Sequence, residues 1–498
     1  MNRRRFVQNG IALIGSVPLL NACDGIYSRL CKDMGQKIPD AIDVSCGTNI
    51  DPIFHLLSRA GYGPWPGDLD RVRKLGTDRW IEEQLEPEKI DDRACDLRAR
   101  RFESMVIPAG ACYDFKKQFL RRDIIRHSLL RATYSKRQLF EVMVGFWSDH
   151  LNISMDKGDC VYLKPADDRL VIRTHALGKF KNLIKASAVS PAMLVYLDGN
   201  QNRVNSSSKV PNENYARELL ELHTLGIHGG YSQRDVYELA RCLTGWRLHE
   251  PWQRGIVYFD ASNHDNGEKH VLGHTIAANG GASDLDKVID IVCTHPSTAL
   301  HISRKIAERF IETPSEGLIQ KLVAEFKNTE GDTKALLRLV LNSDEFANDA
   351  GSKTKRPFTF MASALRSLGV DTHAHDDLVE FLQRMGHVPF QYPTPDGYPD
   401  DSNFWMGTLL WRWKFALALV QKQIKSVSAD IDELYSALKI ENIRRNEADK
   451  LFAYFVGRQP LSSESDALSK LIGSSSKQAN IKEELVALAL CSPAFQRY

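Results

Sequence analysis

From Asp51 onward, apolar residues recur at the spacing of an α-helix almost without interruption, and this pattern limits the fold more than any other feature. The pattern predicts a mainly α protein, a large multi-helical globular domain with long polar loops and at most a small β-hairpin. Fewer than about one residue in ten should lie in strands. Helices are expected at 54–61, 69–75, 78–85, 113–134, 136–151, 170–186, 211–225, 232–243, 283–293, 296–311, 316–327, 332–341, 354–368 and 402–422, with three or four more toward residue 498.

Two polar segments interrupt the helical pattern, at residues 246–282 and 389–401. The first contains one strand candidate, Ile256 to Phe259, so any sheet is expected between residues 246 and 282. Just before it, Ser232 and Asp235 have the spacing of a helix capping box. Long loops in compact domains are often functional, which makes both segments candidate site loops.

The first 22 residues have the pattern of an export signal. Arg3, Arg4 and Phe6 resemble a twin-arginine motif, and an apolar run of about ten residues follows, which is too short to span a bilayer. Residues 20–23 resemble a lipobox, so Cys23 is the expected lipidation site and residues 23–50 the membrane tether. The chain is then expected on the periplasmic side of a bacterial membrane. The alternative is an ordinary secretory signal with a chance cysteine.

Charge and cysteine content exclude some classes of protein. The 65 basic and 63 acidic residues nearly cancel, so no general basic surface for nucleic acid is expected. No CxxC motif occurs among the nine cysteines, and Cys31 with Cys46 is the pair favoured for a disulfide. Residues 404–420 are apolar, but Arg412 and Lys414 interrupt them, so a buried helix is expected rather than a membrane span.

Several motifs occur in a fixed order along the chain. The most specific is the string from Pro211 to Gly226, which is followed by residues 235–246. Further blocks lie at residues 55–63, 146–152, 190–198 and 264–296. In these motifs the chain resembles the bacterial "domain of unknown function 1800" family over about residues 51–420, with residues 421–498 expected as a C-terminal helical part packed on that domain.

The resemblance implies an exported, mostly helical protein but no particular reaction. Similar proteins are often encoded beside a second exported family, which suggests a protein partner in the cell envelope. The chain departs from the family pattern at residues 397–399, where Gly-Tyr-Pro stands in place of Gly-Trp-Pro.

Acidic and histidine residues in these motifs suggest a site. Glu218 and His223 share one helix, and a long polar loop with His264 and Asp265 follows it. We expect these four residues to face one cleft as catalytic groups. Carboxylates and neutral imidazoles also suit a divalent metal. The expected metal ligands are His150, Asp198, Glu218 and His223.

The same residues also allow a purely structural interpretation. Glu218 would then pair with a buried arginine such as Arg241, and His223 would hydrogen-bond a carbonyl near Gly226. The segment at His264 and Asp265 would be a plain turn. No HExxH, GxSxG or phosphate-binding loop occurs to settle the chemistry.

Two functions therefore follow from the sequence. The first is a membrane-tethered scaffold or assembly factor that acts with an exported partner protein, because the chain has a tether, a helical body and no known catalytic signature. The second is a cell-envelope hydrolase with a histidine and carboxylate site, acting with or without a divalent metal.

Overall fold

The computed structural model describes residues 27–204, 210–249, 254–474 and 480–498. Its described elements are mainly helices, and three two-stranded sheets are the only sheets among them. The prediction of a mainly α fold is confirmed. The expected export signal and Cys23 lie outside the described residues.

The N-terminal part forms short helices whose ends follow local rules. The Asp51 side chain accepts a hydrogen bond of 2.8 Å from Ile53 N and so caps the first of the predicted helices. Gly76, at a φ of 92°, separates the next two, as the sequence predicts. Residues 27–31 are helical, and the elements that follow are η1 (Lys32–Gln36), α3 (Pro52–Arg59), α4 (Asp68–Leu75), α5 (Thr77–Leu85), η2 (Pro87–Lys89), α6 (Arg93–Ala99), η3 (Glu103–Met105) and α7 (Ala109–Cys112).

Two long helices then form the centre of the molecule, close to their predicted bounds. The single helix expected at 170–186 is instead two elements, because the chain turns where Gly178 N donates to His175 O over 2.9 Å. The elements are α8 (Lys117–Tyr134), α9 (Gln138–His150), α10 (Cys160–Asp167), η4 (Asp168–Arg173), α11 (Phe180–Ala188), α12 (Pro191–Tyr196) and η5 (Gly199–Gln201).

The motif string at 211–226 forms a shorter helix than predicted. It begins at Asn214, whose N–H donates to the side chain of Asn212 over 3.0 Å, and its last turn is a π-helix. The capping box of Ser232 and Asp235 is confirmed. The elements of this part are α13 (Asn214–Glu218), η6 (Leu219–His223), α14 (Gln233–Cys242), β1 (Trp246–Leu248), β2 (Val257–Phe259), η7 (Ala261–Asn263), β3 (Lys269–Val271) and β4 (His274–Ile276).

The remaining elements return to helices. They are α15 (Ser283–Thr294), α16 (Pro296–Phe310), α17 (Glu316–Thr329), α18 (Thr333–Leu341), α19 (Asp344–Asn348), α20 (Pro357–Ser367), β5 (Asp371–Thr372), α21 (Asp376–Arg384), η8 (Ser402–Thr408), α22 (Leu409–Val420), β6 (Val427–Ser428), α23 (Ile431–Ala437), α24 (Arg445–Val456), α25 (Ser462–Ser474) and α26 (Ile481–Cys491).

All three sheets are antiparallel pairs with strands of two or three residues. The pairs β1–β2 and β3–β4 lie between residues 246 and 282, as predicted. The pair β5–β6 lies outside that range, so the prediction that any sheet stays within it is wrong. Two residues per strand carry no periodic signal that a sequence pattern could reveal.

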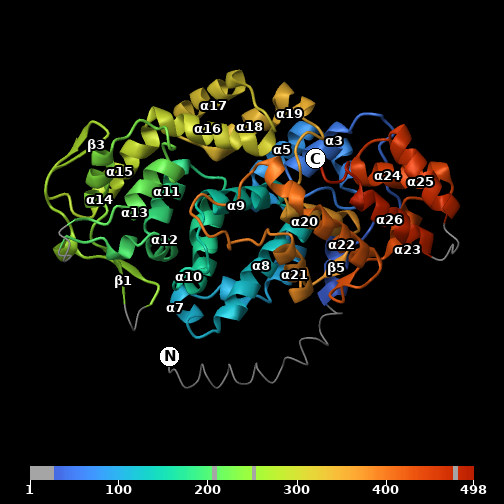
Figure 1. Ribbon diagram of the computed structural model, residues 1–498, viewed down its shortest axis with the longest axis horizontal. Coiled ribbons are helices and arrows are strands. Elements are labelled where there is room, and N and C mark those ends of the chain that lie inside the picture. Colours follow the sequence, from blue (N-terminus) through green and yellow to red (C-terminus); the bar gives the residue numbers. More distant parts are fainter. Residues whose placement is uncertain (1–26, 205–209, 250–253, 475–479) are drawn as a thin grey trace.

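The helices form an elongated body (Figure 1). Helices α12 to α15 and the strands β1 to β4 lie at one end, and α23 to α26 lie at the other. Between them, α8 and α9 face α16, α18 and α20. One buried hydrophobic cluster runs through the body from Ile38 to Phe495, and α22 packs against α26, so the C-terminal helices share this core.

The predicted disulfide between Cys31 and Cys46 is absent, because both thiols are free. Cys31 is buried with its thiol directed at Ala94 O, whereas Cys46 is exposed beside Val44 O. The two side chains therefore have different surroundings and do not meet. Of the helices in the described ranges, none is both long and apolar enough to cross a membrane.

Candidate functional site

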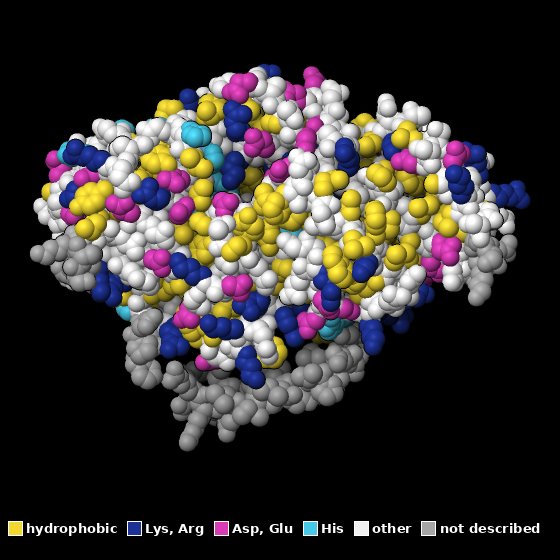
Figure 2. All heavy atoms as spheres, viewed as in Figure 1, with side chains coloured by type: hydrophobic (Ala, Val, Ile, Leu, Met, Phe, Trp, Pro, Cys, Tyr) yellow, Lys and Arg dark blue, Asp and Glu magenta, His cyan; other side chains and the backbone are white. Residues whose placement is uncertain are grey.

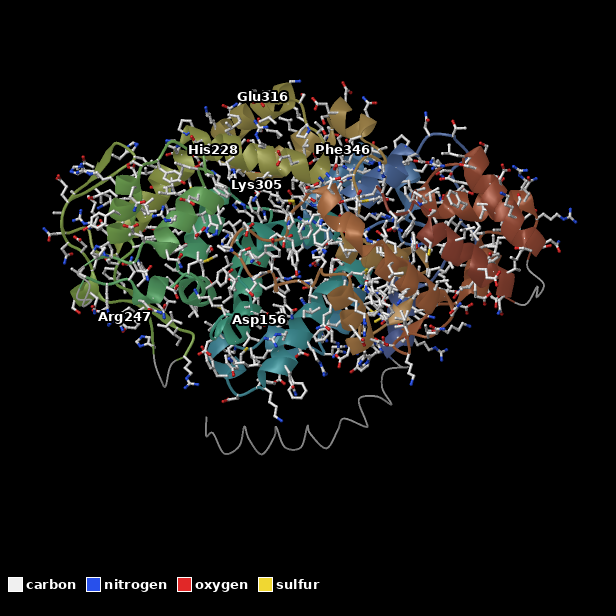
Figure 3. The ribbon with its side chains drawn as sticks, in the orientation of Figure 1. Asp156, His228, Arg247, Lys305, Glu316 and Phe346 are labelled. Carbon is white, nitrogen blue, oxygen red and sulfur yellow. The ribbon has the colours of Figure 1, made fainter. Side chains whose placement is uncertain are left out.

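A cavity of about 660 Å³ lies at the centre of the molecule. Its walls come from α9, from α16, from the segment that leads into α20, and from the loop at 387–402. Lys305 of α16, labelled in Figure 3, lines it. The charged residues of the lining are Glu141, Asp149, Arg173, Arg304, Lys305, Glu308, Arg309, Glu312, Lys353, Arg356, Asp396, Asp400 and Asp401.

The loop at 389–401 is held against α9 by backbone contacts. Asn152 Nδ2 donates to Tyr392 O over 3.0 Å and to Thr394 O over 2.7 Å. Gly397 has a φ of 75°, and a Cβ atom there would lie 2.2 Å from Asp149 O. Because only glycine permits both this conformation and this approach, the loop forms a fixed wall of the cavity.

An ion-pair network joins three of these walls. The Arg356 guanidinium binds Asp149 of α9, and its Nε lies 3.2 Å from Asp400 Oδ1. Burial raises the pKa of Asp149, and Arg356 opposes this increase. Burial would also raise the pKa of Asp400, but Arg356 and Lys353 hold that pKa at about 2. Asp400 is therefore a carboxylate at neutral pH.

Lys353 extends the network toward the C-terminal residue. Its Nζ lies 3.3 Å from Asp400 Oδ2 and 3.5 Å from Glu312 Oε2, and it donates to Glu308 O over 2.8 Å. Tyr498 N donates to Lys353 O over 3.0 Å. With its partners supplied by the protein, Lys353 is a structural cation of the cavity wall.

Lys305 and Glu308 differ from the paired charges of this network. They lie one turn apart on α16, and both line the cavity. Neither side chain has an ion pair within 4 Å or a hydrogen bond with any side chain or backbone of the described ranges. Burial lowers the pKa of Lys305, with Asp149 and Glu308 opposing the change. Burial raises the pKa of Glu308, although this residue is exposed at the open side of the cavity.

His150 and Ser148 add two neutral polar groups to the lining. His150 Nε2 lies 3.0 Å from His223 O and therefore carries the proton, since a carbonyl only accepts. Its Nδ1 is then an acceptor. That atom and Ser148 Oγ are buried and have no partner among the described residues. Burial holds the pKa of His150 well below its usual range, so the ring is neutral.

The structure brings only some of the predicted site residues together. The rings of His150 and His223 have centroids 6.2 Å apart, but His223 lies behind the lining, and burial lowers its pKa to about 3. Asp198 instead contacts Lys157 Nζ at 3.0 Å and Asn214 Nδ2 at 3.2 Å. Within the described ranges no three His, Cys, Asp or Glu side chains could hold a metal ion, so the predicted ligand set is not assembled.

Glu218 lies close to the cavity without lining it. Burial, then Glu221, raises the pKa of Glu218, and Asp396 of the cavity loop adds to the increase. The predicted pair of Glu218 with Arg241 does not form. His223 Nε2 also has no hydrogen-bond partner in the described part of the chain, so the expected bond from that atom to a carbonyl near Gly226 is absent.

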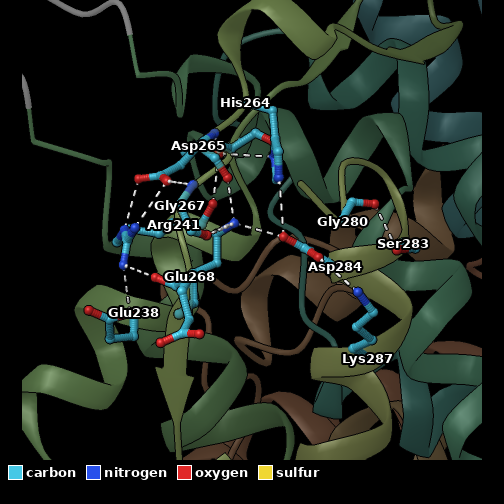
Figure 4. Close-up of polar contacts among 12 residues, drawn as sticks. Glu238, Arg241, His264, Asp265, Gly267, Glu268, Gly280, Ser283, Asp284 and Lys287 are labelled. Carbon is cyan, nitrogen blue, oxygen red and sulfur yellow. Dashed lines mark hydrogen bonds and ion pairs between the residues drawn. The ribbon is translucent and has the colours of Figure 1, made fainter. Parts of the chain in front are cut away.

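His264 and Asp265 belong to a separate network (Figure 4). Asp265 accepts two hydrogen bonds from Arg241, of 2.8 and 3.0 Å. His264 Nε2 lies 3.3 Å from Asp284 Oδ2, and Lys269 Nζ donates to the same oxygen over 2.7 Å. These residues do not line the cavity. Their contacts hold the loop after β2 on α14 and α15.

The sequence reasoning missed Lys305, Glu308 and Arg356 as site residues. Two features of the sequence could have pointed to these residues. Basic and acidic residues occur at positions 304–309 of a helix whose other face is apolar, and a run of basic residues precedes Pro357. Asp149 stood inside a quoted motif, next to His150. The sequence does not show which side chains contact one another. Charged residues that line a cavity therefore look the same in it as charged residues on a solvated helix face.

The fold and the cavity together define an all-α protein with a charged internal site. The chain belongs to the family described as "Protein of unknown function (DUF1800)", whose model matches residues 55–497. The match thus continues past residue 420 into the C-terminal helices. No curated protein and no solved structure matches the chain at a significant level.

Proposed function

We propose that this protein is a hydrolase of the bacterial cell envelope and that its reaction takes place in the central cavity. One observation carries the proposal. Lys305 and Glu308 line the cavity one turn apart, without a charged partner among the described residues, and both have shifted pKa values. Ionisable groups in a cavity whose pKa values move toward neutrality are typical of catalytic sites.

The two groups have complementary roles in the proposed reaction. With a lowered pKa, Lys305 supplies a neutral amine that takes a proton from water as the water oxygen attacks a carbonyl. Glu308, whose pKa burial raises, is placed one turn away to give a proton to the leaving oxygen or nitrogen. His150 and Ser148 line the same cavity and add neutral polar groups to its wall.

A scaffold function explains this cavity less well. A scaffold binds through its outer surface, and a partner surface does not require an unpaired lysine in the wall of an internal cavity. Holding the half-buried Lys305 there without a charged partner in the described ranges costs free energy that an apolar side chain would avoid. The hydrolase proposal gives that lysine a role.

The proposed place of the protein is the periplasmic side of a membrane, with lipid on Cys23. Arg3→Lys together with Arg4→Lys should block export, because the twin-arginine receptor reads the pair. Cys23→Ser should abolish labelling by palmitate. Export of the double variant at the normal rate would indicate the general secretory route instead.

Activity is tested with purified protein and a panel of envelope polymers, namely peptidoglycan, acylated polysaccharide and peptide-linked lipid, with products followed by mass spectrometry. Lys305→Met and Glu308→Gln should each lower the rate by about 100-fold or more. Lys321→Met and Glu484→Gln, at exposed positions on α17 and α26, are the matched controls. Equal rates in all four variants would refute the roles given to α16.

A second measurement does not depend on the substrate. Because its pKa is lowered, Lys305 should be acylated by a small amine-reactive reagent at pH 7 sooner than the exposed Lys321. Peptide mapping reports both rates in one sample. Slower labelling of Lys305 at every pH up to 10 would contradict a neutral, accessible amine.

A further inference from the structure

We propose that the exposed apolar face of η8 and α22 is a docking surface for a lipid bilayer with anionic headgroups. This proposal does not depend on the hydrolase reaction, since it concerns another surface of the molecule. It adds a second membrane contact to the proposed lipid anchor. The face consists of Phe404, Met406, Leu410, Trp413 and Leu417.

These five side chains expose between 43% and 57% of their surface, which is unusual for large apolar residues on neighbouring turns. Leu410, Trp413 and Leu417 follow at intervals of three and four residues and so share one face of α22. Figure 2 shows hydrophobic side chains grouped where Figure 1 places this helix. A row of this kind suits the boundary between headgroups and acyl chains.

The charge around this face indicates what covers it. Between Asn403 and Ala429 the chain contains no acidic residue. Lys414, Lys422 and Lys425 are exposed there, and none of them has an ion pair with a carboxylate in the described ranges. Lys414 also lies over the Trp411 ring, at 4.4 Å from its centroid. Three exposed lysines beside an apolar face with tryptophan match the headgroups and interface of an anionic membrane.

The same charge argues against a second copy of the chain. A symmetric dimer places one face against itself, so Lys414, Lys422 and Lys425 would meet like charges. A bilayer with anionic lipids instead supplies charges of opposite sign. Charge complementarity therefore favours the membrane as the occupant.

The start of the described chain lies at the same end of α22. Ser28 donates a hydrogen bond to Asp371 of β5, and Asp371 pairs with Ser428 of β6, which follows α22. Only three residues lie between Cys23 and Tyr27, so the two positions are at most about 14 Å apart along the chain. A lipid on Cys23 would thus hold this end of α22 close to the bilayer.

The docked face also borders the central cavity. Ser402 lines the cavity and stands two residues before Phe404 in the same η8 segment. A bilayer on this face would lie beside one edge of the cavity. The proposal therefore also gives the orientation of the protein on the membrane.

The orientation is tested with the mature protein in vesicles of phosphatidylethanolamine and phosphatidylglycerol that carry brominated acyl chains. Bromine quenches tryptophan at the interface, so wild-type fluorescence should fall and Trp413→Phe should lose most of the quenched signal. Leu410→Glu with Leu417→Glu should abolish the quenching at an unchanged melting temperature. Leu461→Glu, another exposed leucine, is the control and should quench like wild type.

The charge contribution is tested by Lys414→Gln, Lys422→Gln and Lys425→Gln together. This variant should lose at least half of the increase in quenching that phosphatidylglycerol produces over phosphatidylethanolamine alone. Intact mass reports lipidation of Cys23 separately, so a missing anchor is distinguished from a missing docking face. Unchanged quenching in the variant Leu410→Glu with Leu417→Glu would overturn the proposal. It would also be overturned if sedimentation showed that the wild type is a dimer and that this variant is a monomer.

Discussion

Removal of the Arg356 side chain should destabilise the protein in a pH-dependent way. Arg356 binds Asp149 and Asp400 on two different walls of the cavity, and its own side chain is 17% exposed. In Arg356→Met, both carboxylates lose their common cation while remaining largely shielded from water. Asp149 is then left without its ion-pair partner, and Asp400 keeps only Lys353. A charge that is poorly compensated at such a position raises the free energy of the folded state.

The size of the effect follows from the two carboxylates. The pKa of Asp400 is about 2 in the folded protein against an ordinary value of 3.8, and this shift corresponds to about 2 kcal/mol of folding free energy. Arg356 is the largest of the cationic contributions to the shift, and Lys353 and Arg309 supply the rest. Breaking a fully buried pair costs about 3–5 kcal/mol. Since Asp149 and Asp400 are 26% and 29% exposed, we expect a loss of about 3 kcal/mol at pH 7.

The sign of the pH dependence is also defined. The folded pKa of Asp400 lies below its unfolded value, so its stabilising contribution is complete above about pH 4 and disappears as the pH falls through 2. In Arg356→Met the two carboxylates lose the cation that lowers their pKa values, so at pH 3 they can take up protons and avoid the cost of an uncompensated charge. The difference between wild type and Arg356→Met should therefore be smaller at pH 3 than at pH 7.

Urea unfolding followed by circular dichroism at 222 nm measures both quantities. Arg338→Met is the control, because Arg338 and Glu82 form a pair that is 46% and 52% exposed and is worth at most about 1 kcal/mol. The reasoning fails if Arg356→Met loses no more stability than this control at pH 7. It also fails if the loss is as large at pH 3 as at pH 7.

Lys305→Met should raise the melting temperature at pH 7, because burial penalises the charged form of Lys305. The gain should vanish as the pH rises to about 10, where the wild-type lysine loses its charge in the unfolded chain as well, and a gain that persists at that pH would contradict this cause. Iodoacetamide should label Cys46 in the folded protein while Cys31 reacts only after unfolding, which peptide mapping can check. Gly397→Ala should lower the melting temperature through a steric clash with α9. The control is Gly386→Ala, which is also at positive φ but has open space around it and should cost only about 1 kcal/mol. Equal losses of stability in the two variants would exclude the clash.

Helix positions follow from the sequence because their causes are local. The apolar spacing of residues 117–150 shows which side chains one face of each helix buries, and the structure places α8 and α9 there. Ser232 caps α14, and Gly76 separates α4 from α5, through contacts within a few residues. Such interactions are complete within a single segment, so one sequence is sufficient to predict them.

The assembly of the site depends instead on contacts between distant segments. Lys305, Asp149, Arg356 and Asp400 stand on four segments that only the packing of α9, α16 and α20 brings to one cavity. The same packing places His264 in a separate network and leaves Asp198 paired with a lysine. The sequence alone therefore determines the residue types and the face of each helix that is buried. The tertiary structure decides which charges are neutralised and which remain free for chemistry, because burial and the distances between charges exist only once the chain has folded.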